Sequence, residues 1–419
     1  MKKTIYGMKL IIAMMILAGL ILPVSAVSAE EVRHEPITTK LIELLDDEPE
    51  IKEMLIQSIE KAKKQNPDKI TNPAQDYESY LKYIDEASKL FPQQILEKPS
   101  NLIRDQVLQS LCYFYFLVDQ PLPELEDLGL FKPSLQYYKP FSKWTREFAV
   151  TWGDYLDTEE SWNEKNFKHF ENDPLFGLRV GWYESPSHWK TFNQFFAKYL
   201  RSPYERPIAY PYDSAIVVSP ADSEPQGTWP IDEKSNIHVK SKIVTYYNVN
   251  ELLAKDSKYK DAFANGVLTH TFLNVFDYHR YHFAVGGTVL EKKIIQQNVA
   301  LEVTWNEKES KYDPIDSTGW QFTQTRGYVI VDTGTYGLVA LIPMGMAQVS
   351  SVNFEPGVFV GSMHKKGDML GNFLFGGSDF VMLFQEKAGF EIMVQKESNE
   401  DAYKHILMGV KYGVMNGQN

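Results

Sequence analysis

The stretch Leu374-Phe375-Gly376-Gly377-Ser378 stands directly before a hydrophobic run at residues 380–384. Paired glycines before such a run are typical of a tight turn that leads into a β-strand. Further runs of β-branched and aromatic residues begin near residue 215, and clusters of Gly or Pro separate most of them. These runs lie at residues 216–218, 269–276, 327–332 and 337–342. The second half of the chain is therefore predicted to form an antiparallel, partly closed β fold.

The first half of the chain has helical patterns instead. On one predicted helix the apolar residues recur at i, i+3, i+4 and i+8, and they are Ile51, Met54, Leu55 and Ile59. A last helical stretch at residues 189–200 runs into three prolines, which favours a junction between domains. We therefore expect an α+β protein, in which a helical accessory domain at 32–176 precedes a β-rich domain at 186–419.

Residues 1–29 have the pattern of an export signal. Three lysines precede an apolar run at residues 10–22, and two Val-Ser-Ala triplets follow it, ending at Ala26 and Ala29. The apolar run is shorter than the roughly 20 residues that span a bilayer, so a cleaved signal is favoured over a retained anchor. We expect the protein to be exported, to the periplasm, the extracellular space or the outer face of a membrane.

Charge and cysteine content exclude several classes of function. The formal net charge of −12 disfavours nucleic acid as a partner, and it gives an anionic membrane no broad electrostatic attraction for the chain. Cys112 is the only cysteine, so no disulfide can form within the chain. Its apolar neighbours predict a buried and inert thiol rather than a catalytic one.

Three short segments of the β-rich half carry reactive groups. They are the turn Ser219-Pro220-Ala221-Asp222, the run Asp277-Tyr278-His279-Arg280-Tyr281-His282, and the Gly377-Ser378 stretch. Together they supply an acid, imidazoles and a hydroxyl, which are the parts of an activated nucleophile. Each segment also has a structural interpretation, since Asp222 can cap its own turn and Gly-Gly-Ser can be a simple hairpin. His279 and His282 lack an obvious third ligand, so no metal site is predicted.

In this order, these segments resemble the phosphatidylserine decarboxylase family. That family has an Asp-Tyr-His-Arg-x-His strand end, matched at 277–282, a Ser-Pro-x-Asp turn, matched at 219–222, and a Gly-Ser cleavage site, matched at Gly377-Ser378. Residues 192–196 with Arg206-Pro207, the pair Thr325-Arg326, and residues 337–339 and 366–371 are similar to further segments of the family. The resemblance covers residues 186–385.

Three positions depart from the family pattern without removing a reacting atom. Ser223 follows Asp222 where Gly is usual, Ala284 replaces a Pro, and Asp379 replaces a Thr after the cleaved serine. The helical extension and the export signal are more similar to the branch that includes fungal L-tryptophan decarboxylases. We therefore expect self-processing to be kept and the substrate pocket to differ.

The resemblance implies a self-made cofactor. His282 would act as the base, Asp222 would support its imidazolium, and Ser378 Oγ would attack the carbonyl carbon of Gly377. The chain would be cut between 377 and 378, leaving a pyruvoyl group at position 378 that forms a Schiff base with the substrate amine. His279 is the candidate for returning a proton to the substrate carbon. Arg280 and Arg326 are candidates for binding a carboxylate or phosphate.

Three functions remain open on this basis. The first is pyruvoyl-dependent decarboxylation of a free L-amino acid, for which an aromatic one is a candidate, and the second is decarboxylation of phosphatidylserine to phosphatidylethanolamine. The third is a non-catalytic exported binding protein. The expected partners are a small amino acid or a phospholipid, with peripheral membrane contact in the second case. Self-cleavage would leave two chains, and a homo-oligomer is compatible with the sequence.

Overall fold

The structure is a computed structural model, and it describes residues 33–93, 105–240, 244–315, 319–346, 348, 352–398 and 402–417. Residues His34–Asn419 form one compact unit. The predicted export signal at residues 1–29 lies outside the described residues and stays a prediction. Among the described residues, no helix is long and apolar enough to cross a membrane.

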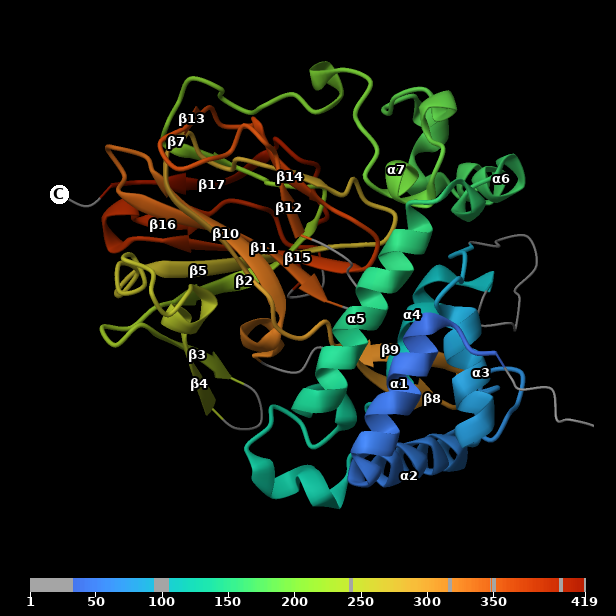
Figure 1. Cartoon of the computed structure of the whole chain (residues 1–419). Helices are drawn as coiled ribbons and strands as arrows, with labels where there is room; N and C mark the ends of the chain where they lie inside the picture. Colours follow the sequence, from blue (N-terminus) through green and yellow to red (C-terminus); the bar gives the residue numbers. More distant parts are fainter. Residues whose placement is uncertain are drawn as a thin grey trace, which may run out of the picture. The chain divides into compact units, whose positions relative to one another are not determined.

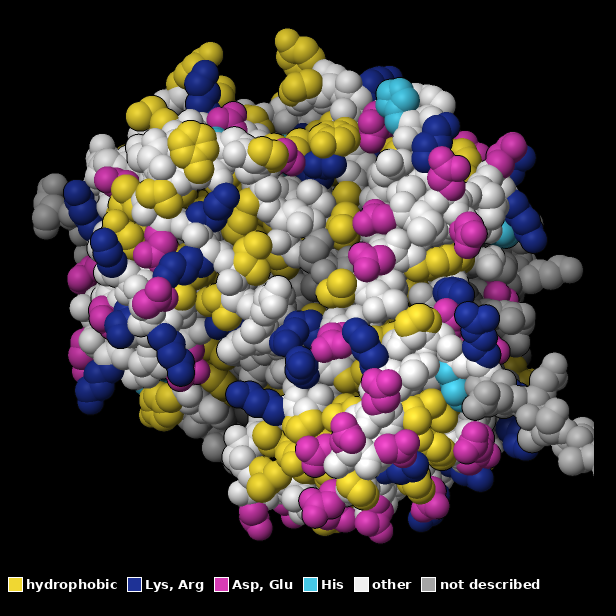
Figure 2. Space-filling view, in the orientation of Figure 1, with side chains coloured by type: hydrophobic (Ala, Val, Ile, Leu, Met, Phe, Trp, Pro, Cys, Tyr) yellow, Lys and Arg dark blue, Asp and Glu magenta, His cyan; other side chains and the backbone are white. Residues whose placement is uncertain are grey.

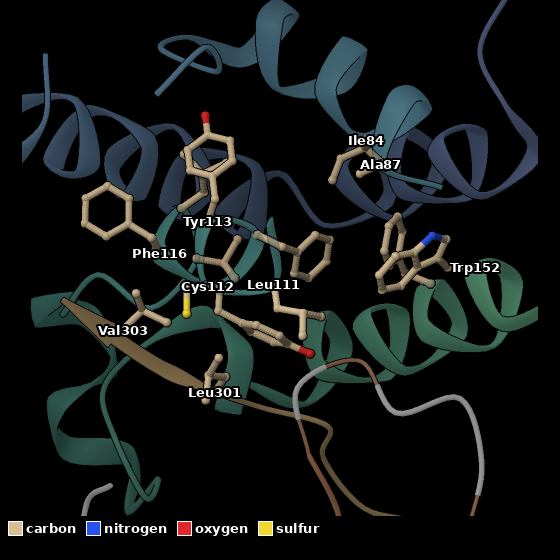
Figure 3. Packing of buried hydrophobic residues seen from close by; sticks show 14 of the residues in the cluster. Ile84, Ala87, Leu111, Cys112, Tyr113, Phe116, Trp152, Leu301 and Val303 are labelled. Atoms are coloured by element: carbon tan, nitrogen blue, oxygen red, sulfur yellow. The ribbon is translucent and has the colours of Figure 1, made fainter. Parts of the chain in front are cut away.

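The N-terminal half is helical, as predicted. Its helices are α1 (Pro36–Asp47), α2 (Pro49–Gln65), α3 (Tyr77–Ala87), α4 (Val107–Phe116), α5 (Lys139–Leu156) and α6 (Glu164–Asn172), followed by the short α7 (Phe192–Phe196). On α2, the predicted stripe of Ile51, Met54, Leu55 and Ile59 is buried. Helix α4 is buried almost all round and occupies the centre of the aromatic core that Figure 3 shows.

The helix expected at residues 189–200 is wrong in its extent. Only Phe192–Phe196 is helical, and Leu200 pairs with Tyr183 in an isolated β-bridge. Lys198 lies between these elements, with its ammonium group 4.7 Å from the ring centre of Tyr183 and 5.2 Å from that of Phe195. The helix begins only after Thr191, whose side chain caps it by accepting from the Gln194 N–H, and it has ended before Leu200 forms its bridge to Tyr183.

A hairpin from the second half packs among the helices. Strands β8 (Glu302–Asn306) and β9 (Lys311–Ile315) lie beside α4 in Figure 1. Gln109 donates from its side-chain amide to the carbonyl oxygen of Tyr312 over 2.8 Å, and its amide oxygen accepts from the Tyr312 N–H over 2.7 Å. Leu301 and Val303 join the core around Cys112, which is buried as expected (Figure 3). The helical half and the β-rich half therefore share one hydrophobic core.

The β-rich half is built on a seven-stranded sheet with the strand order β13-β7-β10-β11-β15-β5-β2, in which all neighbours are antiparallel. These strands are β13 (Met363–His364), β7 (Gly287–Ile295), β10 (Thr325–Asp332), β11 (Leu338–Met346), β15 (Gly377–Phe384), β5 (Val267–Leu273) and β2 (Glu224–Pro230). The predicted antiparallel β-rich organisation and the α+β class are confirmed.

Smaller sheets flank the large one. They are β12-β14-β6, made of Val352–Phe354, Met369–Phe373 and Arg280–His282; β1-β17-β16, made of Ile216–Val218, Lys411–Met415 and Phe390–Ile392; and the hairpin β3-β4, made of Asn236–Lys240 and Val244–Asn248. Strand β15 lies inside the large sheet, and alternate residues enter two different apolar clusters. Phe380 and Met382 pack on one face, and Val381 and Leu383 on the other. The predicted cleavage site therefore lies at the start of a strand whose two faces are both covered by apolar side chains.

Candidate active site

The predicted cleavage dipeptide begins strand β15. Ser378 is paired with Gly345 of β11 on one side and with Leu273 of β5 on the other. Gly376, just before the strand, has φ +145°, a backbone conformation that favours glycine. Ser378 is fully buried, and its Oγ has no hydrogen-bond partner among the described residues. A buried hydroxyl without a partner costs free energy, so this atom is a candidate for a chemical role.

The turn that carries Asp222 lies on the face of the sheet to which Ser378 points. Because side chains alternate along a strand, Ser378 faces the same side as Phe380, and Thr271 faces that side from the neighbouring β5. The Thr271 hydroxyl donates to Ser223 Oγ over 2.7 Å. Strand β6 approaches this face as well, with the Tyr281 and Phe380 ring centres 5.7 Å apart. The fold thus brings the other two predicted segments to the face of β15 toward which Ser378 points.

His282, at the end of β6, is held as a neutral imidazole. Its Nδ1 lies 2.8 Å from the carbonyl oxygen of Gly367, which can only accept, so Nδ1 carries the proton. Its Nε2 lies 3.3 Å from the Tyr278 hydroxyl and therefore accepts from it. Burial lowers the pKa of His282 to about 4. The unprotonated Nε2 is therefore available to take up a proton at neutral pH.

Asp222 is bound by an arginine rather than by the imidazole. The Arg206 Nε lies 2.9 Å from Asp222 Oδ1, the Arg206 Nη2 lies 2.5 Å from Oδ2, and both side chains are buried. The backbone N–H of Met408 also donates to Oδ1 over 2.8 Å. Among the described residues, the imidazole of His282 bonds to Gly367 and Tyr278 and not to Asp222. The predicted support of His282 by Asp222 stays a prediction.

His279 lies beneath an aromatic ring and is fully buried. Its ring stacks on Phe196 with the ring centres 3.9 Å apart, and its Nδ1 donates to the carbonyl oxygen of Asp277 over 2.9 Å. Burial, followed by the charge of Lys198, lowers the pKa of His279 well below its usual value. Its Nε2 has no partner among the described residues. In this tautomer Nε2 is an acceptor, so the predicted proton return requires His279 to gain a proton first.

Both candidate arginines have protein partners. Arg280 donates to the Ala197 carbonyl oxygen over 2.8 Å, and its guanidinium group lies 3.4 Å from the Tyr199 ring centre. Arg326 donates to Gln297 Oε1 and to the backbone carbonyl oxygens of Leu252, Glu251 and Gln324. Burial lowers the pKa of Arg326 to about 10. Their predicted role in substrate binding stays a prediction.

A second group of polar residues lies on the opposite face of β15, and the sequence reasoning did not assign it to a site. Asp379 is fully buried, and its Oδ2 is 3.0 Å from His270 Nε2. His270 lines a cavity of about 200 Å³ whose walls include the aromatic side chains of Trp229, Tyr247, Trp320 and Phe322. Asp379, which departs from the family pattern after the cleavage site, was the only indication of this pair in the sequence. The sequence did not indicate that its partner would be His270 of β5.

The comparisons with known proteins decide the family. A family model described as phosphatidylserine decarboxylase matches residues 192–413, which is more than half of the chain. The chain belongs to the phosphatidylserine decarboxylase family. The proenzymes of this family carry a pyruvoyl cofactor. A glycine-preceded serine with a buried, unpartnered hydroxyl fits the formation of such a group at position 378.

Three curated relatives each match between 54% and 60% of the chain. Phosphatidylserine decarboxylase proenzyme 2 of Oryza sativa subsp. japonica is 33% identical over 229 residues, which are 54% of this chain and 34% of that protein. The protein of the same name from Clostridium acetobutylicum is 29% identical over 256 residues, 60% of this chain and 79% of that protein. Decarboxylase iboD of Amanita muscaria is 26% identical over 287 residues, which are 60% of this chain and 79% of that protein. The chain thus spans about a third of the rice protein and most of the other two.

The buried His282 makes the pH dependence of self-cleavage in this family member testable. If His282 is the base, as the sequence predicts, it must be neutral to act, and burial lowers its pKa to about 4; the cleavage rate should then be constant from pH 8 to about pH 5 and fall as His282 is protonated near pH 4. Freshly synthesised chain would be followed by denaturing mass spectrometry at each pH, with circular dichroism to confirm folding. An inflection near pH 6.5, the ordinary histidine value, would contradict this assignment.

Proposed function

We propose that this family member cuts itself between Gly377 and Ser378 and uses the resulting pyruvoyl group to decarboxylate the serine headgroup of phosphatidylserine. The observation that carries the self-cleavage is the buried, unpartnered hydroxyl of Ser378 at the position of the family's cleavage site. The names of the relatives from rice and Clostridium acetobutylicum support phosphatidylserine as the substrate. They favour it over the free amino acid to which the helical extension pointed.

The reacting groups of the self-cleavage step all belong to the chain itself. His282 Nε2 takes the proton of Ser378 Oγ, Oγ bonds to the Gly377 carbonyl carbon, and the Gly377–Ser378 C–N bond breaks as the amine nitrogen is protonated. Loss of the α-proton of residue 378 then breaks the new ester C–O bond. This leaves a Gly377 carboxylate and a dehydroalanine at position 378. Water hydrolyses the dehydroalanine to ammonia and the pyruvoyl group.

Once formed, the pyruvoyl group would supply an electron sink for the electron pair that stays on the substrate α-carbon when carbon dioxide leaves. The protein's own contribution is to exclude water and to place proton carriers around position 378. His279 and His282 are both buried and lie on segments that adjoin the start of β15. Their unprotonated Nε2 atoms can accept protons at neutral pH.

A free aromatic L-amino acid is the second candidate substrate, and one observation favours it. The cavity of about 200 Å³ beside His270 is lined by aromatic residues and is smaller than the roughly 300–1,000 Å³ of a drug-sized site. It has room for one aromatic side chain but not for two acyl chains. Asp379, whose side chain contacts His270, directly follows Ser378 but faces the opposite side of β15, so this candidate requires the group formed at position 378 to turn toward the cavity.

The substrate is tested with the purified, self-cleaved protein. We expect it to release carbon dioxide from vesicles that contain phosphatidylserine and to form phosphatidylethanolamine, detected by lipid mass spectrometry. Free L-serine and free aromatic L-amino acids should give at most background release. Turnover of an aromatic amino acid without turnover of phosphatidylserine would overturn the proposal and support the second candidate.

We also propose that the protein acts after export, on the basis of the signal pattern at residues 1–29. N-terminal sequencing of the protein from its native cells checks this. A new N-terminus after Ala26 or Ala29 is expected, and an N-terminus at Met1 in a cytosolic fraction would contradict it.

A further inference from the structure

Two loops of the β-rich half hold apolar side chains in solvent. One loop lies between residues 203 and 214, and the other lies between residues 357 and 363. Figure 2 shows hydrophobic side chains standing out along the upper edge of this half. We call the following residues the apolar rim, with their exposed fractions: Tyr204 88%, Tyr210 62%, Tyr212 99%, Phe359 57%, Val360 62% and Met363 80%. Contiguous exposed groups of this kind mark interaction sites more often than single exposed residues do.

The two loops adjoin each other. Tyr212 and Met363 line the same surface groove, which has a volume of about 600 Å³. Further along, a Cβ on Gly367 would collide with the side chain of Ile208, so these two residues are in close contact. Tyr212 and Met363 therefore lie on one surface formed by two segments that are about 150 residues apart in the chain.

The first loop is held in shape from inside the protein. The buried ammonium group of Lys366 donates to the carbonyl oxygens of Tyr210 over 2.7 Å, Asp213 over 2.7 Å and Ile216 over 3.0 Å. Tyr210 has φ +46°, a conformation that is unfavourable for a residue other than glycine. A buried charge and a strained residue thus keep the loop in a form that leaves Tyr212 in solvent. Strain of this kind is concentrated at functional positions.

The same loops reach the candidate active site on their inner side. The carbonyl oxygen of Gly367, next to Lys366, accepts from His282 Nδ1. In the other loop, Arg206 follows the exposed Tyr204 by two residues and binds Asp222. The first loop therefore holds Asp222 through Arg206, and the segment that follows the second loop holds His282 through Gly367.

We propose that the apolar rim inserts into the surface of a phospholipid bilayer and so brings the active site to its lipid substrate. This inference rests on the proposed function, because phosphatidylserine resides in a bilayer. Tyrosine suits the boundary between headgroups and acyl chains, since its ring is apolar and its hydroxyl is polar. The chain has a net charge of −12, so insertion of apolar side chains, rather than broad electrostatic attraction, must hold it there.

The test compares a rim variant with a matched control. Tyr212→Ser/Met363→Ser removes the most exposed apolar side chain of each loop, with exposed fractions of 99% and 80%. Ile70→Ser/Leu128→Ser removes two apolar side chains of the helical half that are 55% and 53% exposed. Binding is measured by flotation with phosphatidylcholine vesicles, with and without phosphatidylserine. The rim variant should bind about tenfold more weakly or worse, while the control binds like the unmodified protein.

Equal flotation of the rim variant and the control would overturn the docking proposal. So would a dimer in sedimentation that only the rim variant loses, because the rim would then bind a second copy of the chain. Three further readouts separate this inference from the proposed function, namely self-cleavage, turnover of a soluble short-chain phosphatidylserine, and turnover of vesicle phosphatidylserine. The rim variant should lose only the third. If the unmodified protein turns over neither lipid, the proposed function fails. The flotation comparison still shows whether the apolar rim binds a bilayer.

Discussion

Ser378→Ala is expected to leave a single uncut chain with no detectable decarboxylase activity. The hydroxyl that would attack Gly377 is missing in this variant, and no pyruvoyl group can form at position 378. Denaturing intact-mass spectrometry measures the outcome. The unmodified protein should give two fragments divided after Gly377, of which the smaller, residues 378–419, begins with a pyruvoyl group instead of serine.

Ser58→Ala is the matched control for the loss of a buried hydroxyl. Ser58 lies on α2, and its Oγ donates to the Leu117 carbonyl oxygen over 2.8 Å, far in sequence from the cleavage site. This variant should still cut itself completely. Fragments divided at Gly377 in Ser378→Ala would refute the assignment of the nucleophile. A single native chain in the unmodified protein would instead favour the non-catalytic binding protein.

Arg206→Met is expected to destabilise the fold by about 3–5 kcal/mol, because it leaves the buried Asp222 carboxylate without its cation. The free energy of unfolding is measured by urea denaturation. Both the parent and the variant should carry Ser378→Ala, so that uncut chains are compared. Arg201→Met is the matched control, since Arg201 is 63% exposed and pairs with Glu205 at the surface. An exposed pair of this kind is worth about 0–1 kcal/mol.

A double variant separates the structural role of the pair from a catalytic role of Asp222. Arg206→Met/Asp222→Leu removes both charges and should recover most of the lost stability. With Ser378 restored, this stable double variant should still cut itself far more slowly than the unmodified protein. Full-rate cleavage would show that Asp222 only anchors Arg206. A loss of less than 1 kcal/mol in Arg206→Met would show that the pair does not stabilise the fold as its burial implies.

Local patterns in the sequence were sufficient for the elements of the fold. The stripe of Ile51 to Ile59 predicted helix α2, and the hydrophobic run after Gly377-Ser378 predicted strand β15. Both predictions succeed because the spacing at which side chains return to the same face of a helix or a strand depends on only a few consecutive residues. The helix expected at 189–200 was wrong in its extent, because Thr191 caps a helix that ends at Phe196 and Leu200 pairs with Tyr183 instead. Such contacts depend on residues that local periodicity does not include.

The sequence by itself determined the family, the α+β order of helices and strands, and the candidate reacting residues, because reactive residue types in a characteristic order are visible without coordinates. Only the tertiary structure decided what these residues contact. It paired Asp222 with Arg206, gave His282 its tautomer through Gly367, and placed Asp379 against His270. It also formed one apolar rim from two distant loops. Contacts, burial and the resulting pKa values arise from segments far apart in the chain, and one sequence does not state which of them meet.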